Sequence, residues 1–225
     1  MTGQTAGQTT LARPGVLDRL KGLGALAVRV VLLELRIYAN IARAVVRRPA
    51  IPEGASGFGY HRPVLTILLV FIGLSAVEIP IIDLIVHRWP GVRIALLILG
   101  IWGVTWMVGL LCAYLMRPHT VGPDGIRVRE GLEIDIPLSW DDIASVARGV
   151  RVDEPKSPRI TETEDGRMLS LRVQHETNVE IALEGPTIVR LPGRAPKGGR
   201  QAVTSVRLWT DDLDGFMDAV RRHMP

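Results

Sequence analysis

The sequence predicts an α+β membrane protein, in which an amphipathic helix and a two-helix transmembrane hairpin precede an antiparallel β-domain with a C-terminal helix. The chain of 225 residues is 47% hydrophobic, with a mean hydropathy of +0.22, yet 22% of its residues are charged. The apolar and charged residues must therefore be segregated. Two long apolar runs lie in the middle of the chain, and short runs of alternating character follow them.

The excess of positive charge lies before the first apolar run. Residues 1–62 hold nine Arg and Lys residues against three Asp and Glu residues, whereas residues 117–225 hold sixteen against eighteen. Basic segments bind nucleic acids or anionic membrane surfaces. Here the basic segment adjoins apolar sequence, without zinc-ligand spacing or an RNA-binding aromatic motif. We therefore expect the lipid bilayer as a partner and no nucleic acid.

Residues 1–12 are small, polar and uncharged up to Leu11, which predicts a disordered tail. Residues 13–48 predict an amphipathic helix, because a narrow polar stripe runs along an otherwise apolar surface. The stripe consists of Arg29, Arg36, Asn40, Arg43 and Arg47.

An arginine at the centre of a membrane costs about 2.5–3.5 kcal/mol, so this helix is not expected to span the bilayer. In the interface, its guanidinium groups would lie among the lipid phosphates. Alternatively, the helix packs on another part of the protein, or on a second copy, and the arginine stripe is solvated. Residues 49–63 are rich in Pro and Gly and predict a linker.

Residues 64–86 and 92–116 predict the two transmembrane helices. At about 1.5 Å per residue, each is long enough to cross a hydrocarbon core of about 30 Å. The short polar turn between them makes the two spans antiparallel. Basic residues flank the outer ends of the hairpin more densely than its turn, which predicts a plasma-membrane protein with both termini in the cytoplasm. The flanking residues are Arg43, Arg47, Arg48, Arg62, Arg117, Arg127 and Arg129, against Arg88 and Arg93 in the turn region.

Glu78, Asp83 and His87 are the polar candidates of the first span, because an ionisable group within hydrocarbon is costly and usually functional. Asp83 and His87 are four residues apart and can meet on one helix face. Glu78 is rotated by about 140° from Asp83, so the three cannot form one metal site within the helix. Glu78 has three possible roles: helix pairing or a hydrogen bond to the second span (Thr105, Trp102 or Trp106), contact with a partner, and ion or proton handling.

Residues 117–225 predict about seven short strands, arranged as a barrel or sandwich, and one helix at the C-terminal end. Turn sequences such as Gly122-Pro123-Asp124-Gly125 and Glu184-Gly185-Pro186 separate the strands. An acidic N-cap segment precedes the helix, which places Leu213, Phe216, Met217 and Val220 on one face.

This part of the chain resembles the bacterial pleckstrin-homology-like (PH-like) family of membrane-anchored proteins. The matching sequence segments are Gly125-Ile126-Arg127-Val128-Arg129, then Gly131, the segment from Ile136 to Val146, and the last strand and helix from Val206 to Arg222. The resemblance implies a β-barrel module that contacts proteins or lipids. It does not imply phosphoinositide binding, because only Arg127 and Arg129, with no lysine, stand where phosphoinositide-binding PH domains carry a Lys-x-Arg cluster.

No HExxH pattern and no Gly-x-Ser-x-Gly motif occurs, and Cys112 is the only cysteine. We therefore predict no enzymatic activity, no cofactor and no metal site. The leading hypothesis is a membrane-anchored scaffold or regulatory protein, whose cytoplasmic PH-like domain binds a protein or, as an alternative, a lipid. We expect a protein partner or self-association. The alternative is a small oligomeric transport or ion-sensing component that uses Glu78.

Overall fold

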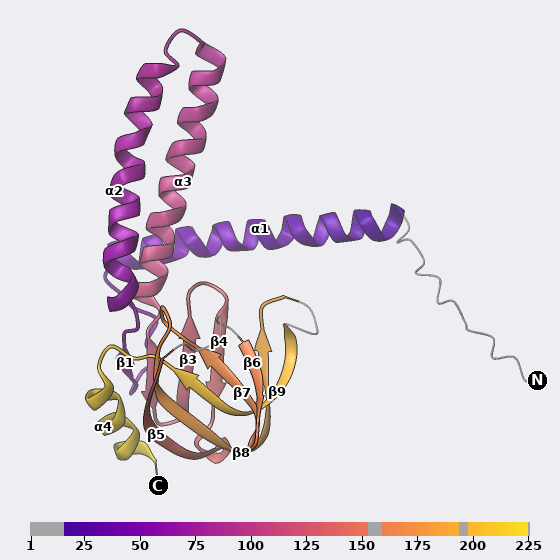
Figure 1. The fold of residues 1–225 in the computed structure, drawn as a ribbon, viewed down its shortest axis with the longest axis vertical. Coiled ribbons are helices and arrows are strands. Elements are labelled where there is room, and N and C mark those ends of the chain that lie inside the picture. The colour runs from indigo at the N-terminus through magenta and orange to yellow at the C-terminus, as the bar shows by residue number, and fades with distance from the viewer. Residues whose placement is uncertain (1–15, 153–158, 194–197, 225) are drawn as a thin grey trace, which may run out of the picture. The chain divides into compact units, whose positions relative to one another are not determined.

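The computed structural model describes residues 16–152, 159–193 and 198–224 (Figure 1). The predicted disordered tail, residues 1–12, lies outside the described residues. The chain divides into two compact units, one ending at Arg36 and the other beginning at Ile37. Helix α1, Val16–Val45, contributes to both.

In the first unit, α1 exposes apolar side chains, among them Val28, Val31, Leu32 and Leu35. Of the predicted arginine stripe, Arg36 is exposed in this unit, and Arg43 and Arg47 are exposed in the second unit. The side chain of Arg29 lies outside the described part. Placement of α1 in a membrane interface remains a prediction.

The C-terminal end of α1 belongs to the second unit and is packed there. Ile37 is fully buried, and its side chain occupies the space that a Cβ atom at Gly109 would need. Asn40 is only 4% exposed, although the sequence placed it on the polar stripe of the helix. The stripe is therefore interrupted where α1 packs.

Helices α2, Arg62–Ile85, and α3, Pro90–Met116, form the hairpin. Each is long and apolar enough to cross a membrane, with a mean hydropathy of 2.4 and 2.3 over its most apolar window. Each has a proline in its first turn, where the missing N–H group costs no hydrogen bond. Most large apolar side chains of α2 point outward, as hydrocarbon surroundings require.

Nine described strands form two sheets in the β-domain. The first sheet is antiparallel, in the order β1-β2-β3-β4, with bounds Ser56–Phe58, His119–Gly122, Gly125–Glu130 and Ile134–Leu138. The second has the order β5-β8-β9-β7-β6. In chain order its strands are Ile143–Arg151, Arg159–Thr163, Gly166–Leu171, Thr177–Leu191 and Gly199–Leu208.

A 3-10 turn, Trp140–Asp142, connects the two sheets, and helix α4, Leu213–His223, follows the last strand. The apolar faces of both sheets and of α4 share one core. Phe216 of α4 is completely buried and meets the ring of Phe58 edge-on, at 5.3 Å between centroids. The Asp212 side chain accepts a hydrogen bond from the Gly215 N–H and caps α4, as its sequence predicts.

The α+β class, the two apolar helices and the C-terminal helix are confirmed, but three predictions need correction. Residues 49–63 are not only a linker, because they contain β1. This strand pairs with β2, which follows the hairpin in the chain. The sheets are not purely antiparallel, because β7 pairs parallel to β9. The predicted Glu184-Gly185-Pro186 turn lies within the single long strand β8, where the pairing register with β9 shifts.

Candidate functional site

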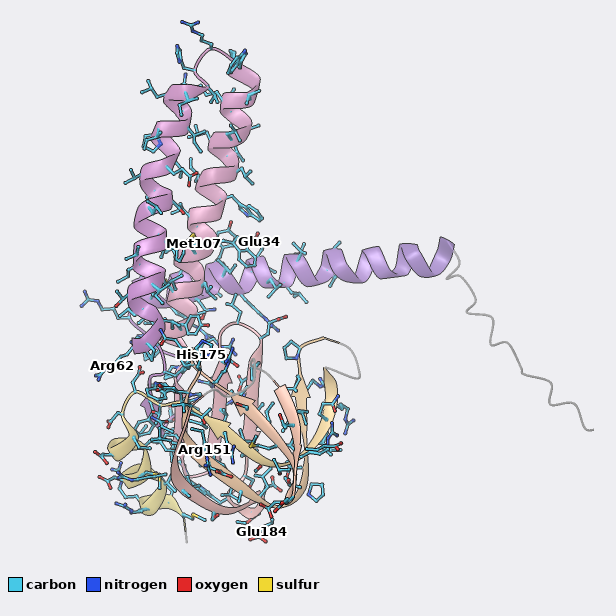
Figure 2. The ribbon with its side chains drawn as sticks, viewed as in Figure 1. Glu34, Arg62, Met107, Arg151, His175 and Glu184 are labelled. Carbon is cyan, nitrogen blue, oxygen red and sulfur yellow. The ribbon has the colours of Figure 1, made fainter. Side chains whose placement is uncertain are left out.

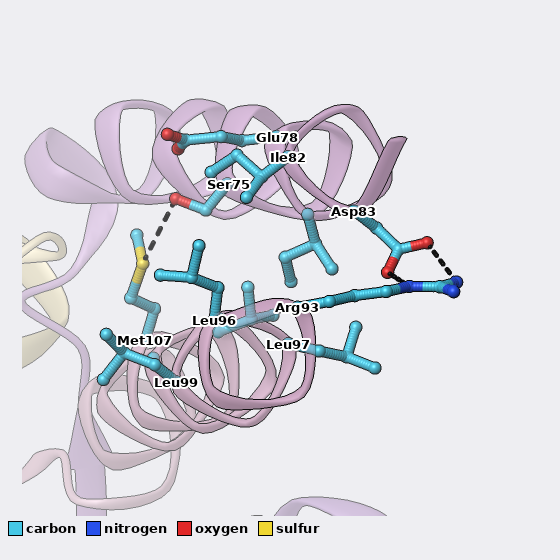
Figure 3. A pocket seen from close by; sticks show the side chains of 13 residues that line it. Ser75, Glu78, Ile82, Asp83, Arg93, Leu96, Leu97, Leu99 and Met107 are labelled. Atoms are coloured by element: carbon cyan, nitrogen blue, oxygen red, sulfur yellow. Dashed lines mark hydrogen bonds and ion pairs between the residues drawn. The ribbon is translucent and has the colours of Figure 1, made fainter. Parts of the chain in front are cut away.

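Asp83 of α2 pairs with Arg93 of α3 across the hairpin turn. Arg93 Nε donates to Asp83 Oδ1 at 2.5 Å, and Arg93 Nη2 donates to Asp83 Oδ2 at 2.8 Å (Figure 3). A two-point pair of this kind fixes the orientation of both side chains. The spacing of Asp83 and His87 predicted that the two side chains could meet on one helix face, but no hydrogen bond joins them. Instead, His87 Nδ1 donates to the Leu84 carbonyl oxygen at 2.7 Å.

Glu78 lies on an exposed part of α2, five residues before Asp83. It forms no hydrogen bond or ion pair with any residue that the structure describes. Thr105, one of its predicted partners, instead donates to the Ile101 carbonyl oxygen of its own helix at 2.8 Å. The sequence identified the costly carboxyl group, but none of the described residues bonds to it.

Glu78 stands beside a groove between α2 and α3, with a volume of about 240 Å³, which we call the hairpin groove (Figure 3). Its apolar walls come from Ile, Leu, Val and Met side chains of both helices, and Gly100 and Gly103 of α3 also line it. The Asp83–Arg93 pair lies at one end. Towards the other end, the Ser75 hydroxyl donates to the Met107 sulfur at 3.8 Å. The groove is therefore mostly apolar, and Glu78 is its one carboxyl group without a partner among the described residues.

Arg129 is the central residue of a second polar cluster, where the hairpin meets the β-domain. Its side chain is 6% exposed. Its Nη1 atom donates to the carbonyl oxygens of Ala50 and Pro118, and its Nε atom lies 3.5 Å from Asp135 Oδ2. Asp135 also faces Arg117, at 3.5 Å, and Arg127, at 2.6 Å. One guanidinium group thus links the segment before β1, the segment after α3 and β4.

His119, at the start of β2, continues this cluster. The Arg129 backbone N–H donates to His119 Nδ1 at 3.0 Å, and His119 Nε2 lies 3.0 Å from the Trp209 carbonyl oxygen. Since a backbone N–H can only donate, Nδ1 carries no proton and the neutral ring donates from Nε2. The ring of Tyr60 lies 4.6 Å from that of His119, and the Tyr60 hydroxyl accepts a hydrogen bond from the Gly131 N–H.

Burial governs the ionisation of this cluster. The pKa of His119 is lowered to about 4, mainly by burial and also by the nearby Arg129 charge, against the opposing effects of the hydrogen bond to Trp209 and the charge of Asp211. Burial also lowers the pKa of Arg129, whereas Asp135 raises it. Burial raises the pKa of the Tyr60 hydroxyl. The cluster is therefore a fixed junction with a neutral histidine and no activated nucleophile among these groups.

Asp211 and Gln174 attach the β-domain to the start of α2. The Asp211 carboxylate accepts hydrogen bonds from the backbone N–H groups of His61, at 2.9 Å, and Arg62, at 3.1 Å. The Gln174 amide donates to the Pro63 carbonyl oxygen at 2.7 Å, from a backbone with a positive φ of 58°. Side chains from two loops of the β-domain thus bond backbone groups in the first turn of α2.

A separate groove of about 360 Å³ lies on the β-domain between the segment before β1, the β2–β3 turn and the end of β4, and we call it the β2–β4 groove. Carboxylates at Glu53, Asp124 and Asp142 line it together with apolar side chains. Arg127 also lines it but is paired with Asp135. The groove therefore presents mainly negative charge.

The sequence did not predict the junction or the partner of Asp83. Arg93 could have been identified as the partner of Asp83 because it lies just after the tight turn. A hairpin places the residues before its turn opposite those after it. His119, Arg129 and Asp211 carry no sequence signal, because their partners are up to 150 residues away. Within the described parts of the chain, no three His, Cys, Asp or Glu residues are grouped as metal ligands would be.

No protein-family model, no curated protein and no solved structure matches the chain.

Proposed function

We propose that this protein is a membrane-anchored scaffold or regulatory module that holds a cytoplasmic PH-like β-domain at the inner surface of the plasma membrane to bind a protein partner. The observation that carries the proposal is the fixed junction between the hairpin and the β-domain. A domain on a flexible tether would sample all orientations, whereas this one is attached to both helices of the hairpin.

The pairing of β1 with β2 supports the hairpin topology. Ser56 and Phe58, before α2, pair with Val121 and His119, after α3. Strands can pair only on one side of a membrane, so the chain between them must cross it an even number of times. Two spans satisfy this condition. The arginine excess at the flanks of the hairpin favours the cytoplasm as that side.

The buried cluster around Arg129 supports a fixed orientation. Arg129 bonds the carbonyl oxygens of Ala50 and Pro118, while Asp211 and Gln174 hold the first turn of α2. Buried polar groups that have partners stabilise one arrangement against others. Here Arg129 Nη1, Asp211 and Gln174 have hydrogen-bond partners, whereas Arg129 Nε only lies 3.5 Å from Asp135 Oδ2. The β-domain would then present the same surface from every molecule.

The β2–β4 groove is the surface that we assign to the partner. It combines apolar side chains with the carboxylates of Glu53, Asp124 and Asp142, a composition that suits a peptide segment with basic and apolar side chains.

The test is site-specific photocrosslinking of the full-length protein in its own membrane. A photoreactive amino acid is placed at Glu53, in the groove, or at Arg151, at the other end of β5 from Asp142, as a control. Both residues are exposed, and Figure 2 labels Arg151 on the β-domain. We expect one protein to be captured stoichiometrically from Glu53 and not from Arg151.

Charge reversal at Asp124 and Asp142 should reduce this capture at least about tenfold if the groove provides the contact. Equal capture from both sites, or capture that the reversal leaves unchanged, would rule out the groove as the binding surface. Release of the protein from membranes by alkaline carbonate would rule out the anchor itself.

We propose ion transport or sensing as a second candidate function, because Glu78 has no partner among the described residues of one chain. In this case several hairpins would assemble around the carboxyl groups. Glu78→Gln should then abolish an ion-dependent flux in vesicles. A flux equal to that of the parent protein, or no flux in either protein, would contradict it.

A further inference from the structure

Glu78 is the most unusual surface feature of the hairpin. It lies within α2, 16 residues after Arg62 and seven before Ile85, so apolar helix extends on both sides of it. Its side chain is exposed, and no described residue bonds to it. A polar group that faces hydrocarbon without a hydrogen bond costs several kcal/mol. We therefore expect this carboxyl group to be covered by a group other than the described residues of its own chain.

The surface around Glu78 has the form of a helix-packing face. Phe71, Leu74, Ile81 and Ile85 stand three or four residues apart in register with Glu78, and all four are more than half exposed. Spacing of this kind places side chains on one side of a helix, where a second helix can pack against them. A single polar residue in such a face sets the register of pairing.

The neighbouring helix contributes a site of close approach. Gly103 of α3 lines the hairpin groove beside Glu78, and a Cβ atom there would meet nothing within 4 Å in its own chain. Glycine in a membrane helix permits close packing of a second helix. Glu78 and Gly103 therefore border the same opening, one on each helix of the hairpin.

The polar groups that line the groove favour a second copy over a bound metal ion. Asp83 and Arg93 pair with each other, which leaves Glu78 as the one lining carboxyl group without a partner among the described residues, whereas a metal ion would need several oxygen ligands. A neutral carboxyl group has one donor and one acceptor, so two facing carboxyl groups can exchange two hydrogen bonds. A twofold axis places the same residue of two chains opposite each other.

We propose that the face formed by Phe71, Leu74, Glu78, Ile81 and Gly103 is a homodimer interface, in which the Glu78 carboxyl groups of two chains bond to each other within the membrane. This inference rests on the membrane anchoring in the proposed function but not on partner binding by the β-domain, since it concerns the hairpin alone. A dimer would bring two β-domains to the same place on the membrane.

The test measures dimer dissociation of the full-length protein in phosphatidylcholine vesicles. Chains are labelled with donor or acceptor dyes at Glu184→Cys in a Cys112→Ser background, and energy transfer is followed as the protein-to-lipid ratio falls. Glu78→Leu should raise the dissociation constant roughly 5- to 30-fold, as expected for loss of an interhelical hydrogen bond. Glu78→Gln should stay within about twofold of the parent, because an amide also donates and accepts.

Two glycine variants provide a matched pair. Gly103→Leu places a side chain in the proposed interface, whereas Gly73→Leu places one elsewhere on α2, and neither Cβ would contact its own chain within 4 Å. We expect Gly103→Leu to weaken the dimer at least about tenfold and Gly73→Leu to leave it unchanged. A monomeric parent protein, a Glu78→Leu variant that dimerises like the parent, or equal effects of the two glycine variants would overturn the proposal.

Discussion

Arg129 and Arg127 stand two residues apart on β3 and face the same carboxylate, but they differ in burial. The Arg129 side chain is 6% exposed and that of Arg127 is 43% exposed. Only Arg129 also bonds two backbone carbonyl groups that have few alternatives. Burial should therefore decide the effect of replacing each residue.

We expect Arg129→Met to reduce the free energy of unfolding by about 3 kcal/mol, because it leaves buried carbonyl groups and part of the Asp135 charge without partners. Arg127→Met should cost less than about 1 kcal/mol, since water replaces the lost partner. Chemical unfolding of the full-length protein in detergent, followed by tryptophan fluorescence, measures both values. Equal losses would contradict a special role for the buried residue.

His119 makes the stability of the β-domain depend on pH. Its pKa is lowered to about 4 in the folded protein and is about 6.5 when unfolded, so the unfolded chain binds the proton more tightly. The stabilising contribution is complete above about pH 6.5 and is lost as the pH falls towards 4. It amounts to about 3 kcal/mol at most.

The variant His119→Gln tests this pH dependence of stability, because the glutamine amide can accept a hydrogen bond from the Arg129 N–H and donate one to the Trp209 carbonyl oxygen without titrating. The variant should lose less unfolding free energy than the parent between about pH 7 and pH 4. Detergent unfolding curves at each pH provide the comparison. Parallel losses in both proteins would assign the pH dependence to other groups.

At the scale of elements, Asp211, which lies just before the last helix of the chain, caps the first apolar helix, α2. Asp211 accepts hydrogen bonds from the N–H groups of His61 and Arg62, at the start of α2, whereas the adjacent Asp212 caps α4 by accepting from Gly215. The neighbours thus cap two different helices. The negative charge of Asp211 also interacts favourably with the positive end of the α2 dipole.

Asp211→Ala should cost about 1 kcal/mol and increase hydrogen exchange at residues 61–64, the start of the membrane helix. Asp212→Ala should have a similar cost but increase exchange at residues 213–216. Hydrogen-exchange mass spectrometry of the two variants distinguishes the locations. Exchange that increases at the same residues in both would contradict the assignment of the two caps.

Elements with a strong local pattern could be predicted from the sequence, and those that depend on distant partners could not. Helices α2 and α3 lie within two residues of their predicted bounds, because continuous apolar runs need no other information. Strand β1 has only three residues and forms because β2 offers an edge after the hairpin. Pairings of this length leave no periodic signal.

The same distinction applies to the candidate sites. Glu78 was evident because a carboxyl group is rare in an apolar run, whereas its exposure depends on how α2 packs on α3. The cluster around Arg129 was not evident, since the segments that it joins are far apart in sequence. The packing of Ile37 on Gly109 likewise needs the folded chain, because a glycine in an apolar helix suggests no particular partner.

At the scale of the molecule, the proposed orientation can be tested directly. A reporter enzyme that is active only in the cytoplasm, fused after Pro225, should be active, and the same reporter inserted in the turn between α2 and α3 should be inactive. The expectation rests on the arginines that flank the hairpin and on the pairing of β1 with β2. The opposite pattern would invert the proposed topology and remove the cytoplasmic β-domain.

The strand that precedes the hairpin also constrains the order in which the protein can be made. When β1 leaves the ribosome, its partner β2 is still more than 60 residues away, beyond both membrane helices. The sheet can close only after the hairpin and β2 have been synthesised and both strands lie on the same side of any membrane that the hairpin crosses. In the proposed topology, a chain that inserted only one of the two helices would therefore leave the edge of β2 uncovered for quality-control proteases.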